Sequence, residues 1–179
     1  EFFWIYAGPP GINNMMARIN SAFTSSVWLQ PSTFNVMVES ANKNAYVGGP
    51  GAYSSNGFNC LGVNQNFLFY YDGLNLAAYN KTNGNIVAST TIPGLTLMAQ
   101  GGIAVDDCNV LYLGGNGSIL SYSFNGTSFN ALTPIPLSIS NPNQYVYDIK
   151  MDKLNKVLYV CGSGFVGTWN ASNSTACSP

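Results

Sequence analysis

The chain has 179 residues with only six basic and seven acidic side chains, no histidine and a formal net charge of −1. This length suits one domain with a sizeable core. The few scattered basic residues exclude a nucleic-acid footprint, and the lack of histidine excludes Ser-His-Asp and Cys-His catalysis. We therefore expect a single domain over residues 1–179 that is not an enzyme, needs no cofactor or metal and binds no nucleic acid.

The cysteines and glycosylation motifs predict an extracellular or cell-surface protein. An even set of four cysteines without C-x-x-C spacing favours disulfides over a zinc site. No apolar stretch reaches the 18 or so residues of a membrane-spanning helix. Five N-x-[ST] acceptors, together with paired cysteines and few charges, favour secretion and glycosylation. The acceptors are Asn80, Asn116, Asn125, Asn170 and Asn173.

Taken in chain order, the sequence repeats a β-rich core that ends in glycine. The cores begin at Phe2, Asn44, Phe67, Asn109 and Lys156. Their aromatic anchors are Tyr6, Tyr46, Phe69, Tyr112 and Tyr159, separated by 40, 23, 43 and 47 residues. Three of these four intervals fit a repeat of 40 to 50 residues, so we expect an internal repeat architecture.

Each full repeat predicts four short antiparallel strands. An apolar strand and a polar turn precede the anchor strand, as in GGIAVDDCNVLYL, which is the pattern of a β-hairpin. A third and a fourth strand follow, joined by turns such as TNGN and FNGT. This is the composition of a propeller blade. We expect an all-β, β-propeller-like fold of about four blades, with approximate units at residues 1–32, 33–57, 58–100, 101–140 and 141–179.

The pattern resembles β-propellers with weak, aromatic and glycine-marked repeats, such as the NHL-like and streptogramin-lyase-like propellers. In those, an apolar strand and an Asp or Asn turn precede a strand like VLYLGG of residues 110–115. The resemblance implies an architecture and no particular activity. Signatures of WD40 and kelch repeats are not evident.

The repeat is irregular at two places. The interval from Tyr46 to Phe69 is too short for four strands, so the unit at 33–57 is expected to be shortened. The chain also begins at a second strand, FFWIYAG, and ends after a third, FVGTWNAS, which predicts an incomplete terminal blade. A missing strand can come from the same chain or from another molecule.

Acidic residues cluster at two predicted turns. Asp106 and Asp107 lie in AVDDCN, and Asp148 and Asp152 lie in YDIKMD of the equivalent hairpin. They could act as calcium ligands or as an acid/base pair. The equivalent positions of Asp106 and Asp152 favour a structural role, in which the side chain caps the turn backbone.

The aromatic residues are expected mainly to fill the space between blades. Tyr70, Tyr71 and Trp169 adjoin turns and are the candidates for exposed rings that stack on a sugar. Among three possible cysteine pairings, Cys60–Cys108 and Cys161–Cys177 keep each bond local.

These features give two hypotheses of function. The first is a secreted, glycosylated structural or surface scaffold that associates with copies of itself, for example in a filament. The alternative is a propeller that binds glycans or other extracellular proteins, as a lectin or receptor ectodomain does.

Overall fold

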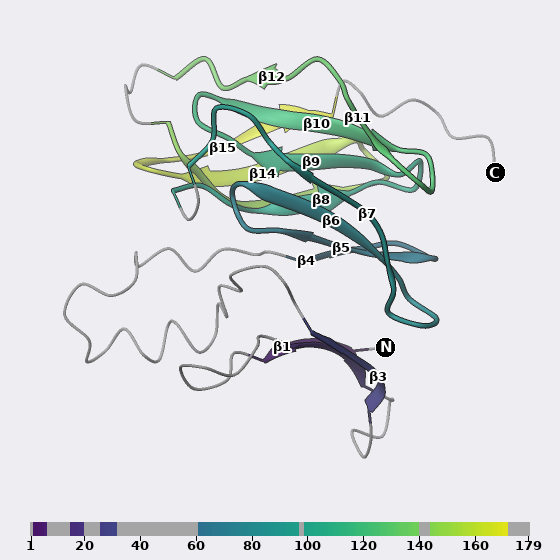
Figure 1. Cartoon of the computed structure of the whole chain (residues 1–179). Coiled ribbons are helices and arrows are strands. Elements are labelled where there is room, and N and C mark those ends of the chain that lie inside the picture. Colours follow the sequence, from purple (N-terminus) through teal and green to yellow (C-terminus); the bar gives the residue numbers. More distant parts are fainter. Residues whose placement is uncertain are drawn as a thin grey trace.

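The computed structural model describes residues 2–6, 15–19, 26–31, 61–96, 99–139 and 144–171. Within these residues the chain is all-β: strands joined by turns, without a helix (Figure 1). The predicted all-β class is thus confirmed. The strands form antiparallel sheets in chain order, and none of the sheets closes on itself.

Four sheets follow one another along the chain. The first has the order β1-β2-β3 and the last β13-β14-β15. Between them lie a sheet of order β4-β5-β6-β7 and one of order β8-β9-β10-β11, in which β12 also pairs with β10. The strands are β1 (Phe2–Tyr6), β2 (Met15–Ile19), β3 (Ser26–Pro31), β4 (Leu61–Val63), β5 (Phe67–Tyr71), β6 (Asn75–Asn80), β7 (Ile86–Thr91), β8 (Ile103–Val105), β9 (Val110–Gly114), β10 (Ser118–Phe124), β11 (Phe129–Ala131), β12 (Ile135–Pro136), β13 (Val146–Asp152), β14 (Val157–Gly162) and β15 (Phe165–Asn170).

Each sheet occupies its own stretch of the chain. Each sheet falls within one of the units 1–32, 58–100, 101–140 and 141–179. The anchor strands are β1, β5, β9 and β14, and each of the last three pairs with the strand before and the strand after it. The unit at 33–57, predicted to be shortened, lies outside the described residues.

The last three sheets pack face to face, so the sheet β8–β11 is covered on both sides. One core fills the space between β4–β7 and β8–β11, and a second fills the space between β8–β12 and β13–β15. Large rings take much of this volume, as predicted: the Phe124 ring centroid lies 5.0 Å from Phe67 and 5.4 Å from Phe69. The first core contains Phe69, Tyr71, Leu76, Ala78, Ile92, Ile103, Val105, Leu111, Leu113 and Phe124. The second contains Ala104, Val110, Tyr112, Ile119, Ile135, Leu137, Val146, Ile149, Leu158, Val160 and Ala171.

The first strands of the three later sheets lie next to one another. β4 contacts β8, and β8 contacts β13. The approach is close enough that a Cβ at Gly62 would come within 2.6 Å of the Val105 side chain. Small or apolar residues on these short strands therefore let three sheets meet along one line.

Candidate functional site

The turns after β4, β8 and β13 are built in the same way. Asn64, Asp106 and Asp152 occupy equivalent positions, each directly after or at the end of its strand. The Oδ1 atom of each accepts backbone N–H groups of its own turn. The donors are Asn66 and Phe67 to Asn64, at 3.0 and 2.9 Å, Cys108 and Val110 to Asp106, both at 2.8 Å, and Asn155 to Asp152, at 3.0 Å.

This geometry confirms the structural interpretation of Asp106 and Asp152. Asp106 is buried, and it uses Oδ1 to hold its turn. Hydrogen bonds from the side chain and the backbone of Asn155 lower the pKa of Asp152 below its usual value. Both carboxylates thus act as acceptors for their own turn, which is a common role of Asp in hairpins.

Contacts between these turns form a polar rim at one end of the stacked sheets. The Asn64 Nδ2 atom donates to Asn109 Oδ1 at 2.5 Å, and Lys153 Nζ donates to Asp107 Oδ1 at 2.6 Å. A pocket of about 250 Å³ lies in the rim, lined by Asn64, Gln65, Asn66, Asp107 and Asn109. We call these turns and this pocket the turn rim.

The acidic residues do not assemble a metal site or an acid/base pair. Within the described part of the chain, no group of three or more Cys, Asp or Glu side chains is placed to hold a metal ion. Asp107 is paired with Lys153, and Asp148 lies 3.3 Å from Lys150. Each carboxylate is therefore engaged by a turn or a lysine.

A second, less polar pocket lies along the first strands of the three later sheets. Its volume is about 190 Å³, and residues of β4, β8 and β13 line it. Most of its wall is aliphatic, and Lys150 and Lys153 supply the cationic groups. Such a pocket suits a small apolar or anionic group, but the lining includes no carboxylate or histidine.

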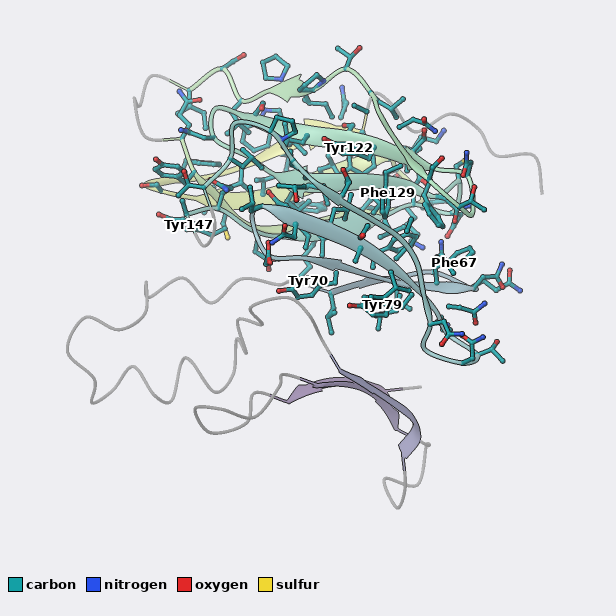
Figure 2. The ribbon with its side chains drawn as sticks, in the orientation of Figure 1. Phe67, Tyr70, Tyr79, Tyr122, Phe129 and Tyr147 are labelled. Carbon is teal, nitrogen blue, oxygen red and sulfur yellow. The ribbon has the colours of Figure 1, made fainter. Side chains whose placement is uncertain are left out.

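The aromatic residues proposed for stacking on sugars are not exposed. Tyr70 and Tyr71 are fully buried, so the prediction that they are surface rings is wrong. Tyr71 faces the sheet β8–β11 and donates to the Gly114 carbonyl at 2.6 Å, whereas Tyr70 lies on the opposite face together with Tyr79 (Figure 2). Both faces of β5 are covered, which explains why its burial does not alternate.

Trp169 also belongs to the packing. Its ring lies across Gly167, where a Cβ would come within 2.6 Å of the indole, and it meets Phe165 edge to face at 6.1 Å. The indole packs on the core between β8–β12 and β13–β15. The expectation that Trp169 is an exposed stacking ring is therefore not supported by its position.

Four of the five predicted glycosylation sites lie in described residues. Asn116, Asn125 and Asn170 are exposed, and Asn80 is half-buried. Asn173 lies outside the described residues. The four asparagines lie at strand ends or in turns.

The predicted cysteine pairings involve Cys60 and Cys177, which the structure does not describe, and they stay predictions. Cys161 in β14 carries a free thiol. Cys161 lies on the outer face of the last sheet, opposite Asp148 and Val166. Cys108 is not a free thiol. Cys60 and Cys177 lie outside the described residues.

The outer face of β13–β15 is an exposed apolar surface that the sequence pattern did not predict. Val166 is 86% exposed and Tyr159 is 52% exposed, and they lie on adjacent strands of this face. Tyr159 is an aromatic anchor of the repeat, as Phe69 and Tyr112 are, so the sequence pattern marks it for burial. We call this surface, formed by Asp148, Lys150, Tyr159, Cys161, Val166 and Thr168, the outer face.

No protein-family model and no curated protein matches this chain. No described segment is a helix of the length and apolar character needed to cross a membrane. The functional assignment therefore rests on the geometry of the chain itself, and above all on the turn rim and the outer face.

Proposed function

We propose that this chain is a secreted, glycosylated structural or surface scaffold of propeller type, with four blades in one copy, that associates with further copies of itself. The observation that supports this proposal is the outer face. Its residues occupy positions that are buried between sheets elsewhere in the chain, but on this face they are exposed to solvent.

The register of the anchor strands carries the argument. Phe69 in β5 and Tyr112 in β9 occupy the position of Tyr159 in β14, and each is buried against the sheet that follows. Leu76 and Ile119 occupy the position of Val166, and both are fully buried. The equivalent residues of β13–β15 are exposed, so the outer face is a repeat interface that no described sheet covers.

The chemistry of the outer face selects another sheet of the same kind as its occupant. Twice in this chain the same face is covered by the next repeat. Figure 1 shows β1–β3 beyond β4–β7, on the side away from β13–β15. A second copy can therefore present its first sheet to the outer face of the first copy. This contact joins two different surfaces of the two copies. When successive copies do not close into a ring, such a contact generates a filament.

The test compares two exposed apolar residues. Lysine at Val166 would place a charge in the proposed interface, whereas Leu154, 89% exposed in the turn after β13, lies outside it. We expect Val166→Lys to weaken self-association by about 10–100-fold, the range for losing one buried aliphatic side chain. Leu154→Lys should leave association unchanged. Sedimentation velocity and electron microscopy of the secreted chain measure both.

The opposite results would be informative. A wild-type chain that stays monomeric at high concentration would overturn the proposal. A monomer in which cross-linking joins Tyr159 to the first sheet of the same chain would replace it with ring closure within one copy.

One observation favours the alternative function. The pocket of the turn rim is lined by amides and one carboxylate, groups that hydrogen-bond well to sugar hydroxyls. A propeller that binds a glycan there would lose binding on Asn109→Ala and keep it on Asn130→Ala, which changes an exposed amide of β11 outside the pocket. Glycan-array binding measures this, and a silent array would count against it.

A further inference from the structure

Three of the sequence motifs for N-glycosylation fall at the same end of three successive sheets. Asn80, Asn125 and Asn170 are spaced at intervals of 45 residues. Asn80 pairs with Phe67 at the end of β6, and Asn170 pairs with Val157 at the end of β15, which are equivalent positions. Asn125 follows the end of β10, two residues beyond the equivalent position. All three therefore adjoin the turn rim.

Backbone hydrogen bonds show that the three sites are built alike. Beside each site, a backbone N–H at the end of the third strand donates to the residue that precedes the anchor strand. These bonds are Lys81 to Asn66 at 3.0 Å, Phe124 to Asn109 at 2.9 Å and Ala171 to Lys156 at 2.9 Å. The placement is thus a property of the repeat. Asn116, at the turn between β9 and β10, lies at the opposite end of its sheet.

The side chains at two of the sites present the atom that is modified. The Asn125 Oδ1 atom accepts from Thr127 N–H at 3.0 Å and Ser128 N–H at 2.9 Å, and Asn80 Oδ1 accepts from Thr82 N–H at 2.8 Å. Because the donors are backbone N–H groups, the contact must be made by the carbonyl oxygen. The amide nitrogen of each side chain then points away from the turn.

Three asparagines outside the N-x-[ST] motif use the amide nitrogen instead. The Nδ2 atom of Asn64 donates to Asn109, that of Asn75 to Asp72, and that of Asn155 to Asp152. Their amide nitrogens are used within the fold. Asn83, outside the motif, also accepts through Oδ1, from the Asn85 N–H at 2.9 Å, so this geometry is not confined to the motif.

We propose that Asn80, Asn125 and Asn170 carry N-linked oligosaccharides that form one row along the turn rim. In the transfer, the side-chain nitrogen bonds to the anomeric carbon of a lipid-pyrophosphate-linked oligosaccharide. The bond from that carbon to the pyrophosphate oxygen breaks, the nitrogen loses one proton, and the lipid pyrophosphate leaves. This inference rests on the proposed secretion of the chain.

The row assigns different roles to different surfaces of the molecule. Glycans at Asn80 and Asn125 flank the pocket of the turn rim and keep this end in solvent. Asn80 retains partial exposure although the sheet β8–β11 covers the same face. A glycan at the equivalent Asn170 is therefore compatible with a further sheet on the outer face.

The experiment uses the chain secreted from eukaryotic cells. Enzymatic release of the glycans in heavy-oxygen water converts each modified asparagine to a labelled aspartate, which peptide mass spectrometry locates. We expect labelled aspartate at positions 80, 125 and 170. Asn125→Asp should remove one glycan while keeping the acceptor oxygen for the turn, and Thr127→Ser should keep the glycan where Thr127→Val loses it. Asn130→Asp, outside any motif, is the control and should not change the mass of the attached glycans.

Two results would overturn the row: unmodified asparagine at the three positions, or glycan at Asn116 alone. Self-association is measured on the same samples. A chain that associates without these glycans refutes the row and leaves the scaffold proposal standing. A chain that carries these glycans and stays monomeric supports the row and overturns the scaffold proposal.

Discussion

Tyr71 shows how one side chain joins two sheets. Its ring lies in the core between β4–β7 and β8–β11, and its hydroxyl donates to the Gly114 carbonyl at the end of β9. Burial raises the pKa of Tyr71 well above its usual value, and the charges of Asp72 and Tyr122 raise it further. The hydroxyl therefore keeps its proton for as long as the sheets stay packed.

Replacing Tyr71 by phenylalanine should separate the contribution of the hydroxyl to stability from that of the buried ring. At pH 7 we expect Tyr71→Phe to lower the free energy of unfolding by about 1 kcal/mol, because one buried hydrogen bond is lost. The unfolded tyrosine ionises near pH 10 and the folded one does not, so wild-type stability falls as pH rises above 10. The variant lacks this loss, and the difference in stability should shrink there.

Urea unfolding at pH 7 and at pH 11 measures the effect. Tyr159→Phe is the matched control, because Tyr159 is an exposed ring in the equivalent repeat. It should change stability little at pH 7. An equal deficit of Tyr71→Phe at both pH values would contradict the argument.

At the scale of elements, the close approach of sheets depends on glycine where a strand begins. Gly102 precedes β8 with a φ of +89°, and a Cβ there would lie 2.7 Å from the Asp148 Cα in β13. Gly94 has a similar φ of +77° but has no atom within 4 Å of such a Cβ. Both positions have a positive φ, but only at Gly102 would a Cβ meet neighbouring atoms.

Alanine at the two positions should therefore have different effects. We expect Gly102→Ala to destabilise the fold by about 2–4 kcal/mol, through backbone strain together with the clash against β13. Gly94→Ala should cost about 1 kcal/mol, from strain alone. Thermal and urea unfolding measure both, and equal costs would show that the crowding is relieved by small shifts.

The elements also show how far the sequence predicts the fold. The hairpins around the anchors at Phe69, Tyr112 and Tyr159 were predictable, because each combines a short apolar strand with a turn of Asp or Asn. The burial of Tyr70 and Tyr71 was not, because β5 is covered on both faces and its apolar run carries no alternation. Exposed Val166 has the sequence pattern of its buried equivalents, Leu76 and Ile119, and it differs from them in that no described sheet covers it.

For the whole molecule, the low charge has a consequence for assembly. The outer face carries one ion pair, Asp148–Lys150, in which the lysine side chain is 64% exposed. Such a pair contributes little in water. Apolar and hydroxyl groups form the rest of the face, so burial of apolar surface should drive association.

Association should then depend weakly on salt and more strongly on temperature. Raising the salt from 0.1 to 1 M shortens the screening length from about 10 to about 3 Å, which weakens contacts between charges. We expect the dissociation constant to change by less than about threefold over this range, and we expect association to weaken on cooling, because apolar burial does. Sedimentation of the wild type and of Lys150→Gln at two salt concentrations and two temperatures measures this. Weakening beyond about tenfold at 1 M salt, absent in Lys150→Gln, would show instead that charges hold the copies together.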